Sequence, residues 1–483
     1  MAGVAGFARS LAFGFVYDDH WTIEGGHLDA PLGKLLGAIA RGAGRDLHIP
    51  DETRPAMVAS TWVDHAVFHG WPAGYHADSL LLYGLVCALA VRACLALTGS
   101  LRVAFVAGLF FALAPVHAEV VCAINYREDL LAAVGVLVPL GILLRRGAGA
   151  RGGVEWVAVG CWAVGLLGKE SAVALVPIVA AVVAIDPVAR ARVRRGWRTW
   201  VAMAAVLAVW AVWRGALMAH GDDIPRSPHG AIVPQLLGTA RFCVRVGVAS
   251  LLPFHPSPEY VREAAAWPLW VLPLIAWVVL VWILARRRAT RTPALGLAVV
   301  LLAGLPSSPL AAPSNEIADR YAFLSVLGAG WVYGWLASQL ALRVPARARA
   351  RVGWTVFTAA CVAMWLACQA ATAPWQSDRT LWLAATELAP TSPRAWEGLS
   401  RVRRLDGDLD GADRDIDQAI ALDPRFVPAH VTRVYNRLAR GDLDGARAEL
   451  AAIRALGGDH ERGVTRATRC AALSPDDAKE CIR

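Results

Sequence analysis

Lysine is almost absent from this sequence, which contains only Lys34, Lys169 and Lys479. Arginine therefore supplies nearly every plain positive charge, so a lysine at an unusual position calls for an explanation. Charges of either sign are also scarce, since 18% of the 483 residues are charged and 56% are hydrophobic. A soluble globular chain does not need so much apolar surface. The composition excludes that class and favours a polytopic membrane protein with a polar appendage.

The sequence also lacks a recognisable signal peptide or full-length membrane helix at its N-terminus. Residues 1–17 are apolar but too short to cross a bilayer, which takes about 20 residues in a helix, and they show no signal-peptide cleavage pattern. We therefore expect a first membrane helix that is truncated at its start. The net charge of +9 does not predict a nucleic-acid partner, because most of the surplus arginine falls in short loops between apolar runs.

Apolar segments after residue 76 predict an all-α, polytopic membrane helix bundle of about 10–11 spans. Four connections between them are rich in arginine, which is typical of cytoplasmic loops. For the other loops to alternate across the membrane, the segment at 233–252 cannot cross, and we interpret it as an interfacial or re-entrant helix on the outer face. The apolar segments lie at about 77–97, 102–116, 129–144, 154–168, 171–185, 199–217, 267–285, 294–312, 322–342 and 353–372, and the Arg-rich connections are Arg145–Arg151, Arg190–Arg198, Arg286–Arg291 and Arg343–Arg351.

Beyond residue 372 the apolar runs give way to an internal repeat. Two motifs recur, both with a spacing of 34 residues: Glu387-Leu-Ala-Pro390 as Ala421-Leu-Asp-Pro424, and Gly407-Asp-Leu-Asp-Gly-Ala412 as Gly441-Asp-Leu-Asp-Gly-Ala446. This is the period of tetratricopeptide helix pairs, which bury their apolar faces by stacking on neighbouring pairs. The pattern predicts a membrane domain over residues 1–372 and a small tetratricopeptide α-solenoid over residues 373–483.

Charged residues gather at the helix ends and loops that this topology assigns to the outer face. They are Asp18 and Asp19, His117 and Glu119, Arg127 and Asp129, Lys169 and Glu170, and Arg320. A bare carboxylate in hydrocarbon costs about 3 kcal/mol, so the adjacent pair Asp18-Asp19 must face water, headgroups or a cavity. Each cluster alone is equally consistent with anchoring a helix end at the interface. Their convergence on one face favours a functional site.

Lys169 and Glu170 interrupt two apolar runs with almost no loop between them. An ion pair at that depth needs a reason, and one of only three lysines is used there. Lysine binds phosphate as a point charge, so Lys169 is a candidate phosphate ligand. Arg320, which precedes another apolar segment, has two interpretations: contact with a phosphate, or anchoring at lipid headgroups.

The long polar loop at 18–76 holds six of the twelve histidines, which raises the question of a metal site. His65 and His69 are four residues apart and would share a helix face, as metal ligands do. No matching carboxylate pattern accompanies them, so we expect surface histidines and no metal site, with a divalent metal as the alternative. His20, next to Asp19, is expected to support the acidic pair.

In their order along the chain these motifs resemble one family, the transmembrane and tetratricopeptide repeat-containing O-mannosyltransferases, which are polytopic glycosyltransferases that use lipid-phosphate sugars. The chain departs from that family in the missing first-helix residues, in a shorter repeat array and in Ala114, where the family often has histidine. The motifs that carry the resemblance are Phe15-Val-Tyr-Asp-Asp-His20, Arg54-Pro55, Gly74-Tyr-His76, Ala114-Pro-Val-His-Ala-Glu119, Arg127-Glu-Asp-Leu-Leu131, Lys169-Glu170, Arg320-Tyr321 and the C-terminal repeats.

The resemblance implies a GT-C-like fold that transfers a hexose, mannose in the family, from a polyprenyl phosphate to Ser or Thr hydroxyls of proteins. Asp18 or Asp19 would take the proton of the acceptor hydroxyl. The leaving lipid phosphate needs charge stabilisation rather than a proton. The residues expected to hold it are Lys169, Arg320, Arg127 and His117, with Glu119, Asp129, Glu170 and His20 in supporting roles.

The resemblance also predicts partners and location. The partners are the lipid-linked donor, membrane lipid and an acceptor protein held by the repeats, and no cofactor is expected. The active site and the repeats would lie on the non-cytoplasmic face. In that oxidising compartment Cys470 and Cys481 would form a disulfide. The other seven cysteines lie in apolar segments and are interpreted as small hydrophobic residues.

Two other functions remain open from the sequence. A non-catalytic scaffold would use the repeats to recruit partner proteins and would not need Asp18, Lys169 and Arg320 together. A lipid or solute transporter would also have polar residues at helix ends, but it should carry charges in the middle of its spans and broken inverted repeats. The sequence has no acidic pair in mid-span, which disfavours the transporter.

Overall fold

The computed structural model describes residues 1–145, 153–219, 232–261, 268–311, 317–458, 463–474, 477 and 481. Within these residues every regular element is a helix and no strand occurs, which confirms the predicted all-α class. The chain divides into two compact units. The membrane unit comprises Met1–Pro256 and Ala265–Trp375, and the repeat unit comprises Ser257–Ala264 and Gln376–Arg483. The change of unit at Trp375 falls close to the division predicted after residue 372.

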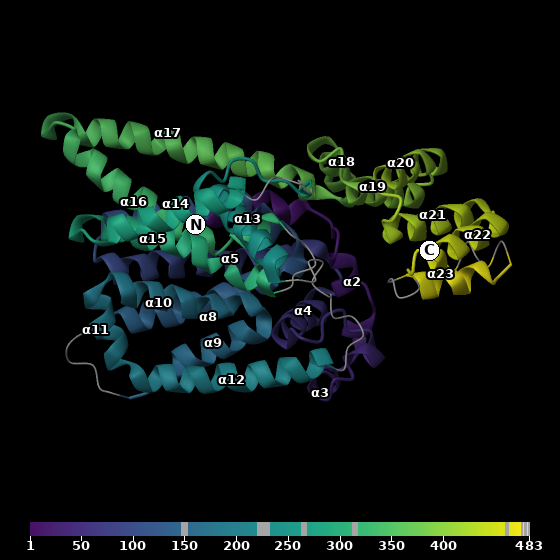
Figure 1. Cartoon of the computed structure of the whole chain (residues 1–483), viewed down its shortest axis with the longest axis horizontal. Coiled ribbons are helices and arrows are strands. Elements are labelled where there is room, and N and C mark those ends of the chain that lie inside the picture. The colour runs from purple at the N-terminus through teal and green to yellow at the C-terminus, as the bar shows by residue number, and fades with distance from the viewer. Residues whose placement is uncertain are drawn as a thin grey trace. The chain divides into compact units, whose positions relative to one another are not determined.

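Long apolar helices build the membrane unit (Figure 1). Among the described residues, six helical stretches are long and apolar enough to cross a membrane, or seven if one bent pair is counted as a span. The six are α5 (Pro72–Thr98), α12 (Trp197–Ala219), α13 (Ile232–Leu251), α14 (Pro268–Ala285), Arg288–Ser307 around α15 (Arg291–Ala303), and Arg351–Gln376, most of it in α17 (Ala346–Thr372); the bent pair joins α6 (Leu101–Ala112) to η4 (Pro115–His117) and α7 (Ala118–Cys122).

This count is smaller than the predicted 10–11 because several predicted spans are short or begin with charges. The helix α9 (Trp156–Gly168) has 13 residues and α10 (Leu175–Ile185) has 11, fewer than the roughly 20 of an ordinary span. The helix α8 (Arg127–Leu144) starts with three charged residues. The helix α16 (Ser325–Arg343) corresponds to the remaining predicted span, at 322–342. The multi-pass character predicted from composition is confirmed, whereas the exact number of spans stays a prediction.

The helices of the membrane unit have two distinct ends. At one end Arg192, on α11 (Pro187–Arg195), donates hydrogen bonds to the carbonyls of Ala96 and Leu144, so the ends of α5 and α8 lie together beside an Arg-rich connection. At the opposite end the side chain of Arg127 joins the start of α8 to the first turns of α5. Figure 1 shows α11 and the α16–α17 turn at one end of the bundle, and α2 (Asp19–Ile23) and α4 (Pro55–Phe68) at the other.

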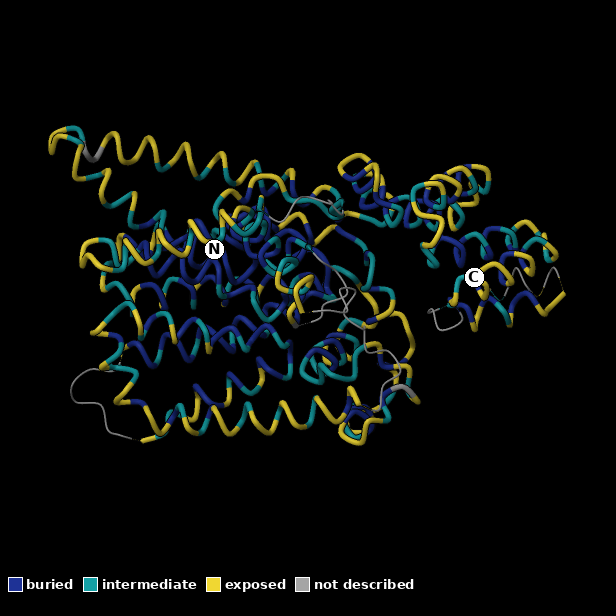
Figure 2. The backbone as a smooth tube through the Cα atoms, in the orientation of Figure 1, coloured by how far each residue is buried: buried dark blue, intermediate teal, exposed yellow. Residues whose placement is uncertain are grey.

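Burial separates inner from outer helices in this unit (Figure 2). The helix α8 is buried along most of its length, whereas α14 is strongly apolar and has no buried residue. Apolar side chains that face outward are suited to lipid rather than water. The inner helices pack closely through glycines: a Cβ on Gly135 of α8 would lie 2.7 Å from the Cα of Gly165 in α9. Small residues of this kind let membrane helices approach each other.

The helix α13 covers the segment that the sequence predicts not to cross. Its 20 residues would suffice for a span. Its contacts point to partial insertion: Phe242 packs against Tyr321, just before α16 begins, and Tyr333, halfway along α16, donates a hydrogen bond to the carbonyl of Leu251. The end of α13 therefore lies beside the middle of α16 and not beside its Arg343 end. This supports the re-entrant interpretation, which stays a prediction.

The repeat unit consists of short amphipathic helices whose boundaries recur. The helices are α18 (Asp378–Leu388), α19 (Pro393–Leu405), α20 (Leu409–Leu422), α21 (Val427–Arg440), α22 (Leu443–Ala455) and α23 (Val464–Ala471). The starts of α19 and α21, and those of α20 and α22, are each 34 residues apart. The helix pairs thus follow the period of the sequence motifs, while their assignment as tetratricopeptide repeats stays a prediction.

The repeated Gly-Asp-Leu-Asp-Gly-Ala motif forms the tight turn between the helices of a pair. Gly407 and Gly441 have φ values of 84° and 80°, a left-handed conformation that glycine adopts without steric cost. Asp408 and Asp442 then cap the next helix by accepting hydrogen bonds from the N–H groups of Gly411 and Gly445. The motif therefore ends one helix and starts the next.

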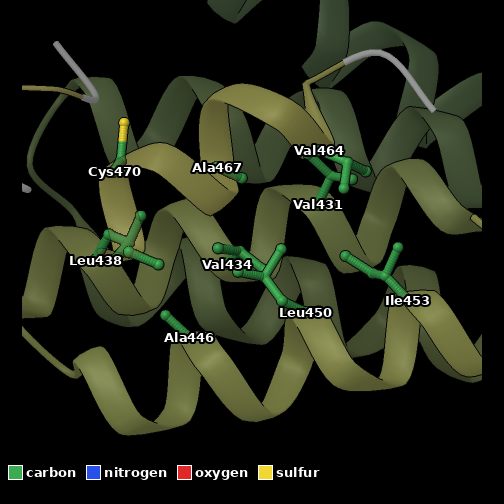
Figure 3. Close-up of a cluster of buried hydrophobic side chains, with 10 residues drawn as sticks. Val431, Val434, Leu438, Ala446, Leu450, Ile453, Val464, Ala467 and Cys470 are labelled. Atoms are coloured by element: carbon green, nitrogen blue, oxygen red, sulfur yellow. The ribbon is translucent and has the colours of Figure 1, made fainter. Parts of the chain in front are cut away.

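The second half of the repeat unit is held by an apolar core and one disulfide. Figure 3 shows side chains from α21, α22 and α23 meeting in a single cluster that includes Val434, Leu450 and Ala467. Cys470 on α23 is bonded to Cys481, which confirms the predicted pair. The seven other cysteines are free and lie at buried or intermediate positions.

Candidate functional site

The two adjacent aspartates at the start of α2 occupy different environments. Asp19 is fully buried and accepts hydrogen bonds from the backbone N–H groups of Asn125, at 2.7 Å, and Val16, at 3.2 Å. It therefore joins the N-terminal segment to the turn that precedes α8. Burial raises the pKa of Asp19 to about 7, although the backbone N–H groups act in the opposite direction. Asp19 is positioned as a structural carboxyl.

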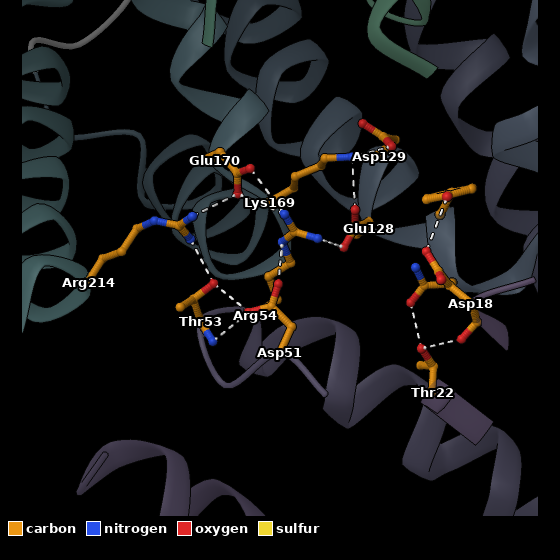
Figure 4. Close-up of polar contacts among 12 residues, drawn as sticks. Asp18, Thr22, Asp51, Thr53, Arg54, Glu128, Asp129, Lys169, Glu170 and Arg214 are labelled. Carbon is orange, nitrogen blue, oxygen red and sulfur yellow. Dashed lines mark hydrogen bonds and ion pairs between the residues drawn. The ribbon is translucent and has the colours of Figure 1, made fainter. Parts of the chain in front are cut away.

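Asp18, in contrast, is half-buried and lies at the edge of a polar cluster. Its carboxylate accepts a hydrogen bond from the hydroxyl of Tyr126 at 3.4 Å. Thr22, one turn later, donates to the Asp18 carbonyl at 3.1 Å and to Asn125 Oδ1 at 2.6 Å. Figure 4 shows this group beside the start of α8. Of the two aspartates, Asp18 is the one that a substrate can reach.

Arg320 lies over the ring of Tyr126. Its guanidinium carbon is 4.5 Å from the centre of that ring and 5.0 Å from that of Tyr321. Glu119 pairs with the guanidinium and also accepts a hydrogen bond from the backbone N–H of Arg320 at 2.8 Å. Among the described residues Glu119 is the one hydrogen-bonding partner of this side chain, so further donors of Arg320 remain for an anion. The sequence-predicted residues Asp18, Glu119 and Arg320 are thus brought together around Tyr126.

Lys169 is almost fully buried, with 3% of its surface exposed. Its ammonium group pairs with Glu128 Oε1 at 2.8 Å and with Asp129 Oδ2 at 2.6 Å (Figure 4). The partner of Lys169 is therefore not the neighbouring Glu170, although the two are adjacent in sequence. A buried cation held between two carboxylates is well compensated. The two carboxylates carry one negative charge more than Lys169 neutralises, and Glu128 pairs with a second cation, Arg54.

Two arginines extend the network from Lys169 to α12. Arg54, at the start of α4, pairs with Glu128 and with Glu170, at 3.1 Å from the latter. Glu170 also pairs with Arg214 of α12 at 3.3 Å, and Arg214 donates a hydrogen bond to Thr53. Carboxylates on three sides raise the pKa of Arg54 well above its usual value against the effect of burial. The chain Asp129–Lys169–Glu128–Arg54–Glu170–Arg214 connects four helices at one end of the bundle.

Two of the predicted phosphate ligands are buried among partners inside the helix bundle, although Nε2 of His117 has no hydrogen-bond partner among the described residues. Arg127 is completely buried, and its donors go to Ser79, Ser60, the Tyr75 carbonyl and Asp64. His117 is also completely buried, packs between Phe111 and Phe323, and shares a hydrogen bond of 2.9 Å with the hydroxyl of Tyr83. The structure does not bring either side chain to the Asp18–Arg320 edge. Both are placed to hold helices together.

The histidines of the 18–76 loop are engaged locally. His20 directly follows Asp19, whose carboxyl it influences electrostatically, and its ring pairs with Glu24 at 2.6 Å on the surface. His65 pairs with Asp29 at 3.0 Å, and His69 lies just past the end of α4 with φ of 48°, so the predicted shared helix face does not form. Within the described residues no group of three or more His, Cys, Asp or Glu side chains is placed to hold a metal ion.

Sequence reasoning missed several members of the cluster. Glu128 stands between two residues that were singled out, and it is the carboxylate shared by Lys169 and Arg54. Tyr126 directly precedes the Arg127 motif and was given no role. Arg214 lies five residues before the end of an apolar helix, where a cation is usually interpreted as snorkelling. The available signal was a charged residue inside an apolar segment, which in a membrane protein indicates a partner.

Comparisons with known proteins identify three curated relatives. Over 181 residues the chain is 31% identical to "Protein O-mannosyl-transferase Tmtc2" of Drosophila melanogaster, a match that covers 35% of this chain and 19% of the relative. It is 30% identical over 150 residues to "Protein O-mannosyl-transferase TMTC4" of Mus musculus, covering 27% and 20%, and 28% identical over 189 residues to TMTC2 of the same organism, covering 36% and 22%.

These relatives confirm the resemblance to the transmembrane and tetratricopeptide repeat-containing O-mannosyltransferases. The matches span about a fifth of the length of the curated relatives. No family model matches the chain, and no solved structure matches it.

Proposed function

From this resemblance we propose that the chain is an integral-membrane glycosyltransferase that moves mannose from a polyprenyl phosphate to Ser or Thr hydroxyls of acceptor proteins. The observation that carries the proposal is the pairing of an accessible carboxylate with a partly free cation. Asp18 and Arg320 contact the same tyrosine ring, one by a hydrogen bond and one by its guanidinium face. A base on one part of this tyrosine and a phosphate ligand on another fit the acceptor hydroxyl and the leaving phosphate of a glycosyl transfer.

Asp18 is the base in this proposal. The acceptor oxygen attacks the anomeric carbon, its proton passes to the Asp18 carboxylate, and the bond between the sugar and the lipid phosphate breaks. The departing phosphate carries the electron pair and is stabilised by the free donors of Arg320. Glu119 holds the guanidinium in place, and Tyr126 keeps Asp18 and Arg320 at a fixed separation. Asp19, being buried, orders the segment that presents Asp18.

The Lys169 network has a supporting part. Lys169 is enclosed by Glu128 and Asp129, which favours a role in fixing the start of α8, where Tyr126 precedes the first turn. Contact between Lys169 and the donor phosphate would require one of these carboxylates to be displaced. The network therefore supports positioning of the site residues, with Arg320 as the phosphate ligand that the geometry favours.

The activity test uses purified chain in detergent with mannose-labelled polyprenyl phosphate and Ser/Thr peptides. Asp18→Asn removes the base, and Arg320→Lys replaces a planar fork by a point charge. We expect both variants to lose at least about tenfold in turnover, equivalent to about 1.4 kcal/mol of barrier. Asp29→Asn, an exposed carboxylate of the same loop, is the matched control and should keep wild-type turnover.

Two results would contradict the proposal. Wild-type turnover in Asp18→Asn and Arg320→Lys would place the chemistry elsewhere. Absence of sugar transfer by a folded, donor-binding wild-type protein would favour the non-catalytic scaffold, since the repeat unit alone suffices for that role.

The location of the site is part of the same proposal. We expect residues 18–76 and the repeat unit to lie on the non-cytoplasmic side, because the positive-inside rule assigns the Arg-rich connections to the cytoplasm and Arg192, in one of them, lies at the other end of the helices. Intact cells carrying Asp29→Cys or Arg425→Cys should react with a membrane-impermeant maleimide, whereas Arg194→Cys should react only after permeabilisation. Labelling of only one of the first two positions would contradict this topology.

A further inference from the structure

One face of α19 in the repeat unit carries three arginines. Arg394, Arg401 and Arg404 are spaced by seven and three residues, which places them on the same side of a helix. The first of them already meets a carboxylate: Glu259, in the segment Ser257–Ala264 of the same unit, lies 4.0 Å from Arg394 and accepts a hydrogen bond from Ser392. This face therefore binds at least one carboxylate from a part of the chain, residues 257–261, that has neither helix nor strand.

Arg401 and Arg404 have no such partner among the described residues. Instead, their guanidinium groups lie against aromatic rings, Arg401 at 5.8 Å from the centre of Trp382 and Arg404 at 5.6 Å from that of Tyr435. The Nε atom of Arg404 is buried and has no hydrogen-bond partner. Many other arginines of the repeat unit do meet a carboxylate: Arg379, Arg394, Arg403, Arg433, Arg437, Arg440 and Arg447.

The local charge around Arg404 is positive. Burial lowers the pKa of the Arg404 guanidinium, and so do the neighbouring cations Arg401 on α19 and Arg466 on α23. Tyr435 and the single carboxylate Glu397 act in the opposite direction without cancelling these effects. A cluster of partly buried like charges is unfavourable unless an anion neutralises it. The contacts with Trp382 and Tyr435 restrict the two guanidinium groups, which reduces the entropy lost when they bind a planar group.

We propose that Arg401 and Arg404, with Tyr435 and Arg466 beside them, bind an acidic segment of a polypeptide, whose Asp or Glu carboxylates take the positions next to the one that Glu259 already occupies. The fork of an arginine matches a carboxylate with two parallel hydrogen bonds. The contact of Glu259 with Arg394 on the same face is the structural precedent for a peptide carboxylate rather than a lipid headgroup. If the function proposed above holds, the segment belongs to the acceptor, but the binding does not depend on sugar transfer.

The test measures binding to the full chain in detergent by fluorescence anisotropy. The probe is a labelled peptide of alternating Asp and Gly residues, and its Asn-for-Asp counterpart is the uncharged control. Arg401→Gln/Arg404→Gln should weaken binding of the acidic peptide by about tenfold or more, the range for losing charged pairs at a binding surface. Arg414→Gln/Arg425→Gln removes the same charge from exposed positions of the unit and should bind like wild type.

Several outcomes would overturn the proposal. Equal loss in the two double variants would mean that only net charge matters. Full competition by phosphatidylserine vesicles or inorganic phosphate, with weak binding of the peptide, would assign the face to phosphate-bearing ligands. Unchanged affinity in Arg401→Lys/Arg404→Lys would contradict recognition by the guanidinium fork. If Arg401→Gln/Arg404→Gln does not purify folded, Arg401→Gln alone should still weaken binding severalfold. Asp18→Asn should bind the peptide normally, which separates this proposal from the catalytic one.

Discussion

Two ion-pair clusters, one from each unit of this protein, differ strongly in burial. In the membrane unit, Lys169, Glu128 and Asp129 form ion pairs with almost no exposed surface. In the repeat unit, Arg440 pairs with Asp410 and Asp413 through side chains that are between 38% and 80% exposed. Distances in the two sets are similar, so geometry alone does not separate them. Burial therefore decides how much stability is lost when each pair is broken.

This difference in burial predicts how much stability is lost when one partner of an ion pair is substituted. A buried pair that loses one partner leaves an uncompensated charge in a medium that solvates it poorly, at a cost of about 3–5 kcal/mol. An exposed pair that loses one partner leaves a charge that water solvates, at a cost of about 0–1 kcal/mol. The two units should therefore respond very differently to the same kind of substitution.

The largest effect is expected at Lys169. Lys169→Met leaves Glu128 and Asp129 without their shared cation, and we expect a loss of stability of about 3–5 kcal/mol, seen as a much lower melting temperature in detergent or as failure to purify. Lys169→Arg keeps the charge and is the control: it should insert and melt nearly normally while lowering turnover by about tenfold. Equal melting of Lys169→Met and wild type would contradict the buried network.

A smaller, pH-dependent effect is expected at Asp19. Because the folded pKa of this carboxyl is raised to about 7, ionisation is harder in the folded protein than in the unfolded chain. Its contribution to stability is therefore most favourable below the unfolded pKa of about 4 and is lost as pH rises towards and beyond 7, by a few kcal/mol. Asp19→Asn cannot ionise, so the difference in melting temperature between wild type and variant should narrow between about pH 4 and 7 and level off above pH 7. A constant difference across that range would contradict the raised pKa.

The smallest effect is expected at Arg440 in the repeat unit. Arg440→Ala removes two exposed ion pairs, and the free energy of unfolding should change by no more than about 1 kcal/mol. Chemical denaturation of the full chain, followed by the fluorescence of a probe attached to the repeat unit, measures this. A loss comparable to that of Lys169→Met would remove the distinction between the two units.

Much of the architecture could be predicted because it follows from periodicity and composition. The 34-residue recurrence of the Gly-Asp-Leu-Asp-Gly-Ala motif predicts the boundaries of α19 to α22, since a left-handed glycine and an N-cap aspartate act locally. Apolar runs predict the membrane helices for the same reason. The number of spans was less predictable, because α9 and α10 are short and depend on neighbouring helices.

The partners of charged residues could be predicted only in part. The scarcity of lysine correctly marked Lys169 as special, but its proximity in sequence to Glu170 suggested the wrong partner. The actual partners come from α8, and Arg54 and Arg214 reach the network from still more distant parts of the chain. Pairing between helices depends on tertiary packing, which spacing along the sequence does not encode. For the same reason, spacing did not distinguish the buried Asp19 from the half-buried Asp18, which the family resemblance only slightly favoured as the base.

The tight turns at Gly407 and Gly441, here called joints, have a consequence for how this protein can change over evolutionary time. Each 34-residue segment carries its own stop for one helix and its own start for the next. Duplication or deletion of a whole segment therefore preserves every joint and every contact between neighbouring pairs. The array can lengthen or shorten without any compensating substitution. The surface offered to a partner, and with it the choice of partner, can thus diversify while the membrane unit stays unchanged.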